Sequence, residues 1–189
     1  MKKMIRLLAG VFLMSVVGCQ SGSQTENGIT TSLVPIGEGW SQTSVNATIF
    51  RKNSVVSTAN YQFVAYYDSS ASVVLARRKH GSDSWEIHQT QYKGNVHDAH
   101  NVISLMVDGD GYLHLSWDHH NNPLNYCRSL SPESLELGPK RPMIGGNEQT
   151  VSYPEFYALP DGDLLFAYRE GGSGNGNLVL NRYDLNDQC

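Results

Sequence analysis

Apolar and polar residues alternate along the chain in short runs that are separated by turn residues. The runs YQFVAYYD (61–68) and SVVLARR (72–78) predict one pair of strands. Two longer runs, VISLMVDGDGYLHLSWD (102–118) and YPEFYALPDGDLLFAYR (153–169), predict hairpins around Asp-Gly turns, and NLVLNRYD (177–184) predicts a further strand. The 3.6-residue period of an amphipathic helix is missing. We therefore expect an all-β fold.

These elements recur at a near-constant interval. Tyr67, Trp117 and Tyr168 follow one another after 50 and 51 residues, and each precedes a charged residue, a polar loop and a strand that bears an arginine. A period near 50 residues built from four short strands is typical of a β-propeller blade. The sequence therefore predicts a β-propeller of four-stranded antiparallel blades over residues 45–189. About three blades fit this length, whereas propellers close with roughly four to eight, so we expect a truncated member of a longer family.

The N-terminus has the pattern of an export signal. Basic residues at positions 2, 3 and 6 precede an apolar stretch of 11 residues, 7–17, which is too short to span a bilayer. The sequence Val-Val-Gly-Cys that ends at Cys19 resembles the bacterial lipobox, which implies cleavage before Cys19 and acylation of its thiol. An ordinary signal peptide with an incidental cysteine is the alternative. Because Gln20 follows the cysteine, we expect the mature protein on the outer membrane of a Gram-negative bacterium.

These features set the expected domain organisation and exclude some function classes. Residues 1–18 are the predicted signal peptide, and residues 19–44 are a lipid-anchored polar tether with a lead-in to the fold. Loss of the signal removes three positive charges, which takes the formal net charge from -4 to -7. A basic nucleic-acid footprint is therefore missing, and no nucleic-acid partner is expected. The sequence has no CxxC motif or disulfide framework, and Cys127 alternates with apolar residues as a core residue does.

Candidate chemistry is concentrated in one part of the chain. All seven histidines fall between positions 80 and 120. When the blades are aligned on their turns, His100 and Tyr153 lie at the starts of first strands, whereas His119, His120 and Arg169 lie at the ends of second strands. In an antiparallel meander these positions share one edge, so we expect the five side chains to converge on one face.

The residue types in this set suit a β-elimination on a uronic acid. An arginine neutralises the substrate carboxylate through a bidentate contact, which makes the proton on the neighbouring carbon more acidic. A histidine or tyrosine removes that proton, and another protonates the leaving oxygen. This chemistry needs no metal or other cofactor.

Each candidate also has a structural alternative. For His100, beside Asp98 and Asn101, two roles are equally weighted: a catalytic role, and a structural role in which neighbouring residues form its hydrogen bonds. His119 and His120 could form only a polar loop or a metal site, although zinc would want a third ligand at fixed spacing.

Four further features of the sequence have simpler interpretations. Tyr153, which precedes a proline, could be simply a packing residue. Arg169 could simply form an ion pair with Glu170 or an aspartate. His114 alternates with leucines and is expected to be structural. The segment GGSGNG (171–176) is expected to be a flexible loop, because no helix follows it as in a phosphate-binding site.

The segments DAHNVISLMVDGDGYLHLSWDHHNNPLNYCRS and YPEFYALPDGDLLFAYREGGSGNGNLVLNRYD resemble the BNR-repeat propeller family that includes bacterial ulvan lyases. The resemblance covers roughly residues 45–184. It implies a seven-bladed propeller that cleaves ulvan, a sulfated polysaccharide of rhamnose 3-sulfate and uronic acids, by β-elimination. Full-length relatives could hold a structural metal in later blades, which this chain lacks.

The resemblance also implies roles for individual residues. The family's histidine in the HN motif falls on His100, and its histidine after the Trp-Asp pair falls on His120, or on His119 if the loop is shifted. The tyrosine of the YP motif falls on Tyr153, and the carboxylate-neutralising arginine falls on Arg169. The neighbouring residues expected to contact the substrate are His119, Asn101 and Asn121.

The resulting hypothesis is a monomeric, lipid-anchored polysaccharide lyase on an acidic sulfated polysaccharide. A non-catalytic glycan-binding lipoprotein or an inactive remnant is the first alternative. A glycoside hydrolase is the second, since sialidases use the same repeats, but the arginine cluster and paired acid that it needs are not evident in the sequence.

Overall fold

The computed structural model describes residues 24–26, 29–48, 53 and 55–188. The predicted signal peptide and the predicted lipidation site, Cys19, lie outside these residues. The chain divides into two units, residues 1–35 and 36–189. In the first unit, β1 (Gln24–Glu26) and β2 (Ile29–Thr31) pair antiparallel within the predicted tether.

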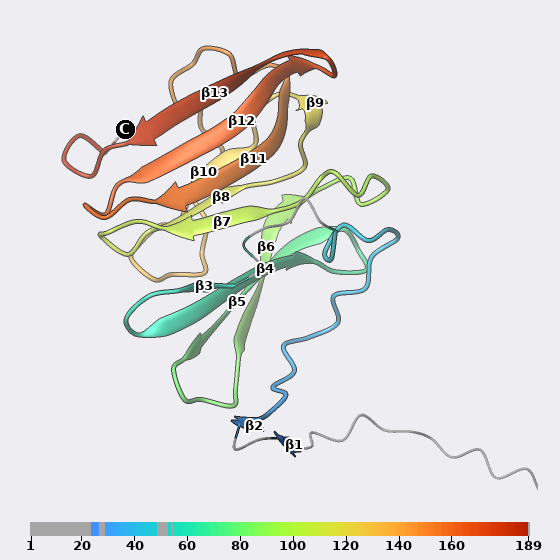
Figure 1. Ribbon diagram of the computed structural model, residues 1–189, viewed down its shortest axis with the longest axis vertical. Helices are drawn as coiled ribbons and strands as arrows, with labels where there is room; N and C mark the ends of the chain where they lie inside the picture. Colours follow the sequence, from blue (N-terminus) through green and yellow to red (C-terminus); the bar gives the residue numbers. More distant parts are fainter. Residues whose placement is uncertain (1–23, 27–28, 49–52, 54, 189) are drawn as a thin grey trace, which may run out of the picture. The chain divides into compact units, whose positions relative to one another are not determined.

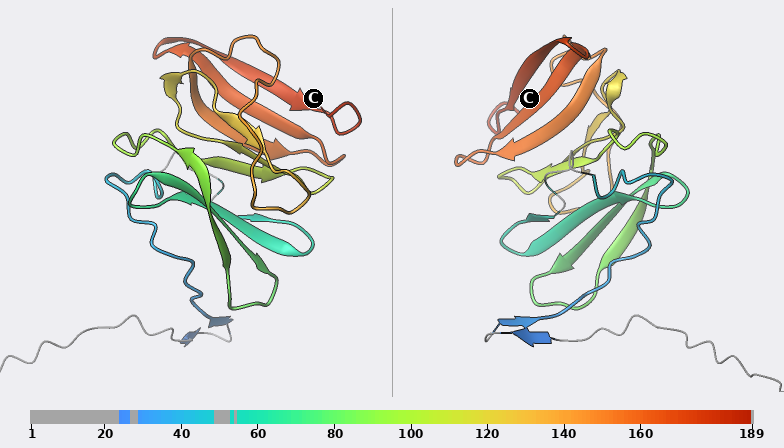
Figure 2. Two further views of the ribbon diagram at one scale, coloured as in Figure 1. Left: turned by 180° about the vertical axis from the view of Figure 1, so that it is seen from behind. Right: turned by 45° about the vertical axis from the view of Figure 1, so that its right-hand side comes forward.

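The second unit consists of three antiparallel sheets (Figures 1 and 2), and no helix occurs among the described residues. The first sheet is a four-stranded meander whose strands follow the order of the chain. Its strands are β3 (Val56–Ser57), β4 (Tyr61–Tyr67), β5 (Ser72–Lys79) and β6 (Glu86–Lys93). The strand pair predicted from the first two alternating runs is therefore confirmed.

The second and third sheets each contain one of the predicted hairpins, but the second sheet has three strands and the third has four. The second sheet has the order β10-β8-β7, and the third has the order β13-β12-β11-β9. The second sheet consists of β7 (Ser104–Val107), β8 (Leu113–Ser116) and β10 (Tyr126–Arg128). The third consists of β9 (His120–Asn122), β11 (Val151–Ala158), β12 (Leu164–Gly172) and β13 (Asn175–Tyr183).

The position of β9 explains why the second sheet has three strands instead of four. At Asp118 the backbone is left-handed, with φ of 64°, and it turns the chain away from the end of β8. The chain then pairs antiparallel with the start of β11, Asn122 opposite Val151 and His120 opposite Ser152. The polar loop after the Trp-Asp pair thereby becomes the edge of the next sheet.

Apolar side chains fill the spaces between successive sheets. Phe63, Leu75, Leu105 and Leu115 belong to one cluster that joins the first sheet to the second. A second cluster joins the second sheet to the third and includes Tyr126, Phe156, Phe166 and Tyr168. Cys127 lies in the first cluster with no exposed surface, as predicted, and burial raises the pKa of its thiol to about 12.

The two predicted Asp-Gly turns contact each other. The backbone N–H of Gly109 donates a hydrogen bond of 2.8 Å to the carbonyl of Gly162. A Cβ atom at Gly109 would lie 2.9 Å from the Cα atom of Gly162, so a side chain would push the two turns apart. Glycine at these two positions therefore allows the second and third sheets to approach at this edge.

The compact unit begins at Ile36, inside the segment that was expected to lead into the fold. Val45 is fully buried, and the Thr43 hydroxyl donates to the carbonyl of Val96 at 2.7 Å. The Asn46 side chain accepts from the backbone N–H of Tyr67 and donates to the carbonyl of the same residue. These contacts attach the lead-in segment to the first sheet.

The expectation of a flexible loop at residues 171–176 is wrong. Strands β12 and β13 continue into this segment, and Gly172 pairs with Asn175 across a tight turn. Gly171 has φ of 92° and Gly174 has φ of 72°, conformations that glycine adopts without strain. The glycines therefore form a hairpin.

Within the described residues, the structure contains no helix long and apolar enough to cross a membrane.

Candidate active site

Three of the predicted site residues lie side by side although they come from different segments. The ring centroids of His100 and His120 are 4.3 Å apart. The Tyr153 ring lies 5.8 Å from the His100 ring and 6.2 Å from the His120 ring. His100 precedes β7, His120 begins β9 and Tyr153 lies on β11. The predicted convergence is therefore observed for these three side chains.

Arg169 completes the group from the neighbouring strand. Its guanidinium carbon lies 5.1 Å from the centroid of the Tyr153 ring. Its Nε donates to the carbonyl of Gly171, and its Nη2 donates to the hydroxyl of Ser152, both at 3.1 Å. A Cβ atom at Gly176 would lie 2.8 Å from Cγ of Arg169, so the glycine on β13 leaves room for the arginine stem.

The expected structural alternative for Arg169 does not fit these contacts. Glu170 accepts a hydrogen bond from the Thr150 hydroxyl at 3.0 Å instead. Among the residues that the structure describes, no carboxylate forms a salt bridge with Arg169. Among the described residues, therefore, no acidic side chain neutralises its positive charge through a salt bridge.

Unusual backbone conformations surround the group. Asp118, Asn121 and Tyr153 are left-handed, with φ of 64°, 67° and 56°. The register between β11 and β12 shifts between Ser152 and Glu155, which marks a β-bulge at Tyr153. A bulge and left-handed non-glycine residues redirect side chains at some cost in conformational energy, and they are common at functional sites. Here they bring His120 and Tyr153 to the same edge.

Ser152 links the two strands that carry the site. Its buried hydroxyl accepts from the backbone N–H of Asn121 at 2.7 Å and from the Arg169 guanidinium at 3.1 Å. One side chain therefore fixes the loop after His120 and the orientation of Arg169.

Asp98 is a site residue that the sequence analysis did not single out. Its Oδ1 accepts from Nδ1 of His100 at 2.5 Å, and its Oδ2 accepts from Nδ1 of His120 at 2.6 Å. Burial raises the pKa of the Asp98 carboxyl, but hydrogen bonds from the His100 backbone and from both rings outweigh it. The net pKa lies well below its usual value. The only sequence signal was an acid two residues before His100.

Asp98, His100 and His120 also offer three potential metal ligands whose atoms lie within 4.8 Å of one another. Two ligands of a tetrahedral zinc ion, each about 2.1 Å from it, would be about 3.4 Å apart. The separations of 2.5 and 2.6 Å between the Asp98 oxygens and the ring nitrogens are shorter and fit hydrogen bonds. A metal ion would require the rings to move away from the carboxylate. The expectation that no cofactor is needed stays a prediction.

Two of the expected substrate contacts are wrong. His119 has no exposed surface, and its Nε2 accepts from the backbone N–H of Asn125 at 3.0 Å. Burial lowers the pKa of His119 to about 4. Asn101 is 4% exposed, and its amide donates to the carbonyl of Asn95. Both side chains are held inside the loops.

Two other residues fit their predicted placement. Asn121 is exposed beside the group and remains a candidate for substrate contact. His114 is structural as predicted, because it lies fully buried between Asp108 and Tyr126.

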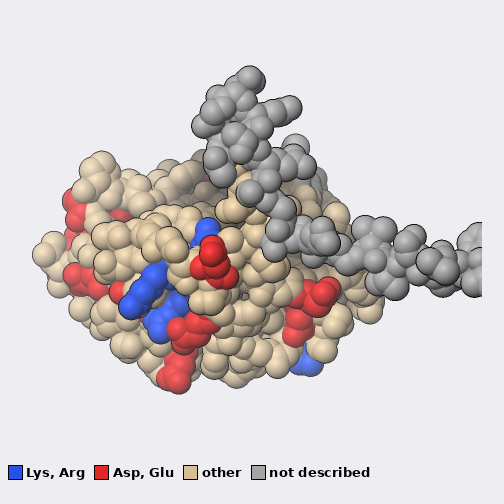
Figure 3. Space-filling model, turned by 90° about the horizontal axis from the view of Figure 1, so that it is seen from below, with Lys and Arg blue, Asp and Glu red and all other residues tan. Residues whose placement is uncertain are grey.

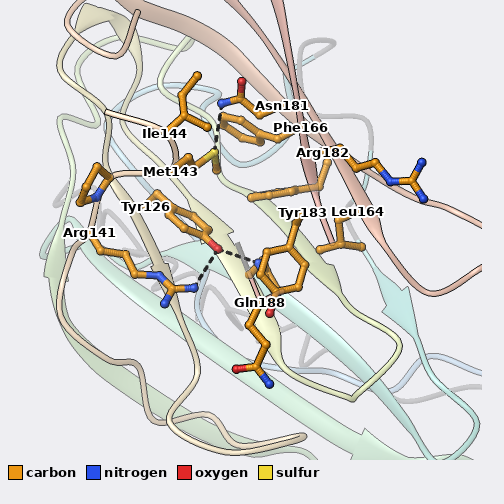
Figure 4. Close-up of a pocket in the computed structure, with 13 residues that line it drawn as sticks. Tyr126, Arg141, Met143, Ile144, Leu164, Phe166, Asn181, Arg182, Tyr183 and Gln188 are labelled. Atoms are coloured by element: carbon orange, nitrogen blue, oxygen red, sulfur yellow. Dashed lines mark hydrogen bonds between the residues drawn. The ribbon is translucent and has the colours of Figure 1, made fainter. Parts of the chain in front are cut away.

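A cavity of about 130 Å³ lies elsewhere, between the second and third sheets (Figure 4). Its lining includes Tyr126, Arg141, Met143, Phe166 and Tyr183 but not the converging side chains. The surface seen in Figure 3 carries Lys and Arg beside Asp and Glu, without a broad basic patch.

Several known proteins resemble this chain in sequence. The profile of the BNR repeat-containing family matches residues 61–189. The long isoform of ulvan lyase from Glaciecola sp. (strain KUL10) is 26% identical in an alignment that covers 72% of this chain and 18% of that protein. The short isoform from Alteromonas sp. (strain LOR) is 43% identical over 42 residues, 22% of this chain and 8% of that protein. The chain thus spans a minor part of these relatives.

The fold resembles solved lyase structures. The polysaccharide lyase Uly1 matches with a TM-score of 0.61 and 17% identity over 80% of this chain and 46% of that one. An ulvan lyase solved with -[GlcA(1-4)Rha3S]- matches with a TM-score of 0.58 and 13% identity over 74% of this chain and 36% of that one. These likenesses establish the β-propeller fold. With its profile match over residues 61–189, the chain belongs to the BNR repeat-containing family.

Proposed function

We propose that this chain carries the catalytic group of a polysaccharide lyase that cleaves an ulvan-type sulfated uronate polymer by β-elimination. The observation that carries the proposal is the convergence of His100, His120, Tyr153 and Arg169 from four separate segments. The ulvan lyases among its relatives, one of them solved with a glucuronate-containing ligand, support the substrate class.

Arg169 would neutralise the uronate carboxylate. Its guanidinium is a planar donor held over Tyr153, and it is not engaged in a salt bridge among the described residues. Negative charge grows on the substrate carboxylate as the proton on C5 is removed. A bidentate contact therefore stabilises the transition state more than the bound substrate.

The elimination would use the histidines and the tyrosine as proton carriers. Nε2 of His100 or His120 takes the C5 proton, and the C5–H electron pair forms the C4–C5 double bond. The C4–O4 bond breaks, and its oxygen takes a proton from the Tyr153 hydroxyl. The products are a 4,5-unsaturated uronate end and a new hydroxyl end. Tyr153 regains its proton from the imidazolium through solvent, so the protons balance without a redox partner.

Turnover of ulvan by the purified full chain tests this proposal. We expect absorbance in the near ultraviolet from the unsaturated product, and a large loss of it in His100→Gln and in His120→Gln. His88→Gln is the matched control, because His88 lies on β6 of the first sheet, where it pairs with Leu75. Binding without new absorbance would instead support a non-catalytic glycan-binding protein, and saturated reducing ends would support a hydrolase.

The same proposal places the protein on the cell envelope through Cys19. The lipobox-like sequence before Cys19 supports lipidation and outer-membrane attachment. Expression with labelled palmitate in a Gram-negative host should label the full chain and leave Cys19→Ala unlabelled. Equal labelling of both, or of neither, would refute the anchor and leave the lyase proposal intact.

A further inference from the structure

One carboxylate holds both histidines of the proposed site. Oδ1 of Asp98 accepts from Nδ1 of His100, and Oδ2 accepts from Nδ1 of His120, so each oxygen serves a different ring. The backbone N–H of His100 donates a third bond to Oδ1 at 2.9 Å. The two rings lie 4.3 Å apart at an interplanar angle of 31°. Asp98 therefore fixes the position of both rings relative to each other.

The same bonds fix which nitrogen of each ring carries the proton. An ionised carboxylate can only accept hydrogen bonds, so both Nδ1 atoms must carry a hydrogen. An aspartate carboxyl is ionised at neutral pH. In a neutral imidazole with a hydrogen on Nδ1, Nε2 has the lone pair. Both histidines are then in the tautomer whose Nε2 can take up a proton.

We propose that Asp98 is the positioning residue of this site, which holds His100 and His120 in the Nδ1–H tautomer and orients Nε2 of each toward the substrate. The inference deepens the proposed lyase function and rests on it for the reaction. The assignment of the tautomers rests on the hydrogen bonds alone. Asp98 also stabilises the imidazolium that forms when one ring takes up a proton, since its charge faces that ring at hydrogen-bond distance.

Asp98→Asn gives a specific test because an amide matches only half of this arrangement. Its oxygen can accept from one Nδ1–H, but its NH2 group donates and needs a lone pair on the other ring. One of the two histidines should therefore switch to the Nε2–H tautomer. Asp98→Glu keeps two accepting oxygens and should retain both original tautomers.

The tautomers can be read from two-bond 1H–15N spectra of the full chain labelled at histidine. Spectra of His100→Gln and His120→Gln assign the two rings. In the wild-type protein we expect both in the Nδ1–H form, and in Asp98→Asn we expect one in the Nε2–H form. Asp68→Asn is the matched control, because Asp68 also accepts from three donors, Ser70, Ser72 and Gln89, but holds no histidine.

Activity measured on the same samples separates this inference from the proposed function. We expect Asp98→Asn to lower kcat by roughly 10² to 10⁴-fold with a smaller change in KM. Asp98→Glu should recover part of the loss, and Asp68→Asn should retain kcat. Unchanged tautomers in a folded Asp98→Asn would overturn the inference, as would the Nε2–H form of both rings in the wild type. If Asp98→Asn does not fold, loss of the Nδ1–H form in Asp98→Glu is the overturning result. A tautomer switch in a chain without lyase activity would refute the proposed function alone.

Discussion

Two groups of the same residue types lie around the second sheet, and they differ in burial. In the closed group, His114 contacts Asp108 at 2.9 Å and Tyr126 at 2.8 Å, and Arg141 lies over the Tyr126 ring. In the open group, Asp98 contacts two histidines, and Arg169 lies over the Tyr153 ring. The His114 and Asp108 side chains have no exposed surface, whereas about a third of the Asp98 and His100 side chains is exposed.

The difference shows that residue type alone does not make a site. Both ring nitrogens of His114 are engaged, Nε2 with Asp108 and Nδ1 with Tyr126. Burial also lowers the pKa of His114, which keeps the ring neutral. Such a histidine can neither approach a polysaccharide nor exchange a proton with it. The closed group therefore stabilises the packing of the second and third sheets, and the open group is the one suited to catalysis.

The largest difference between the two groups is expected when their arginines are replaced, and it should be a difference in kcat. Arg169→Lys keeps a positive charge but loses the planar pair of donors, so we expect kcat to fall by roughly 10² to 10³-fold. Arg141→Lys is the control, because Arg141 holds the corresponding place over Tyr126 in the closed group. The measurement is the initial rate of unsaturated product formation from ulvan, with circular dichroism to verify folding. Equal rates for Arg169→Lys and the wild type would remove Arg169 from the mechanism.

The hydroxyl of Tyr153 should have the next largest effect. Tyr153→Phe keeps the ring beside the histidines but removes the proton donor for the leaving oxygen, so we expect kcat to fall by about 10²-fold. The left-handed backbone at Tyr153 is retained in the variant, because the change is confined to the end of the side chain. Steady-state rates and thermal unfolding should therefore separate, with a loss of rate far greater than any change in melting temperature explains. A fall in melting temperature large enough to explain the lower rate would indicate a structural role.

Much of the open group could be predicted from the sequence because it follows the repeat. The Asp-Gly turns set the alignment of the two hairpins, and that alignment brought His100, Tyr153 and Arg169 to one edge. Asp98 could not be recognised in this way. An acid two residues before a histidine is also a common turn residue, and its oxygen does accept from the backbone of His100. Only the structure shows that its second oxygen reaches His120.

The error at His119 has its physical origin in the loop after β8. Asp118 is left-handed without being a glycine, so no residue signalled the turn that buries His119 and exposes His120. The pairing of β9 with β11 depends on backbone hydrogen bonds of a short polar segment, which lacks an apolar alternation. Sequence periodicity reports buried faces, and it does not detect such a strand.

Acidification should destabilise the protein through its buried histidines before it affects Asp98. The folded-state pKa of His119 is about 4, below the usual value of about 6.5 for an unfolded chain. As pH falls through this window, the unfolded state takes up the proton first, so stability is lost between about pH 6.5 and 4. The loss should be on the order of 2 kcal/mol by pH 5. His114 contributes in the same direction. Asp98 has a lowered pKa, so its contribution is retained until the pH falls below about 4.

Urea unfolding at pH 7 and pH 5 measures this effect. His119→Gln can still accept from the backbone of Asn125, and it has no titrating ring. The variant should lose less stability than the wild type between the two pH values. An identical pH dependence in both proteins would show that His119 is not the source.

The smallest effect is expected from the tyrosine of the closed group. Tyr126→Phe removes the hydroxyl that pairs with Nδ1 of His114 and leaves that buried nitrogen without this partner. Loss of one buried hydrogen bond should lower the free energy of unfolding by about 1 kcal/mol, or the melting temperature by roughly 2–4 °C. The same substitution therefore has opposite consequences in the two groups. At position 126 it should lower stability and leave kcat unchanged, whereas at position 153 its main effect should be on kcat. A loss of kcat in Tyr126→Phe at a temperature where the protein is fully folded would show that the two groups are coupled.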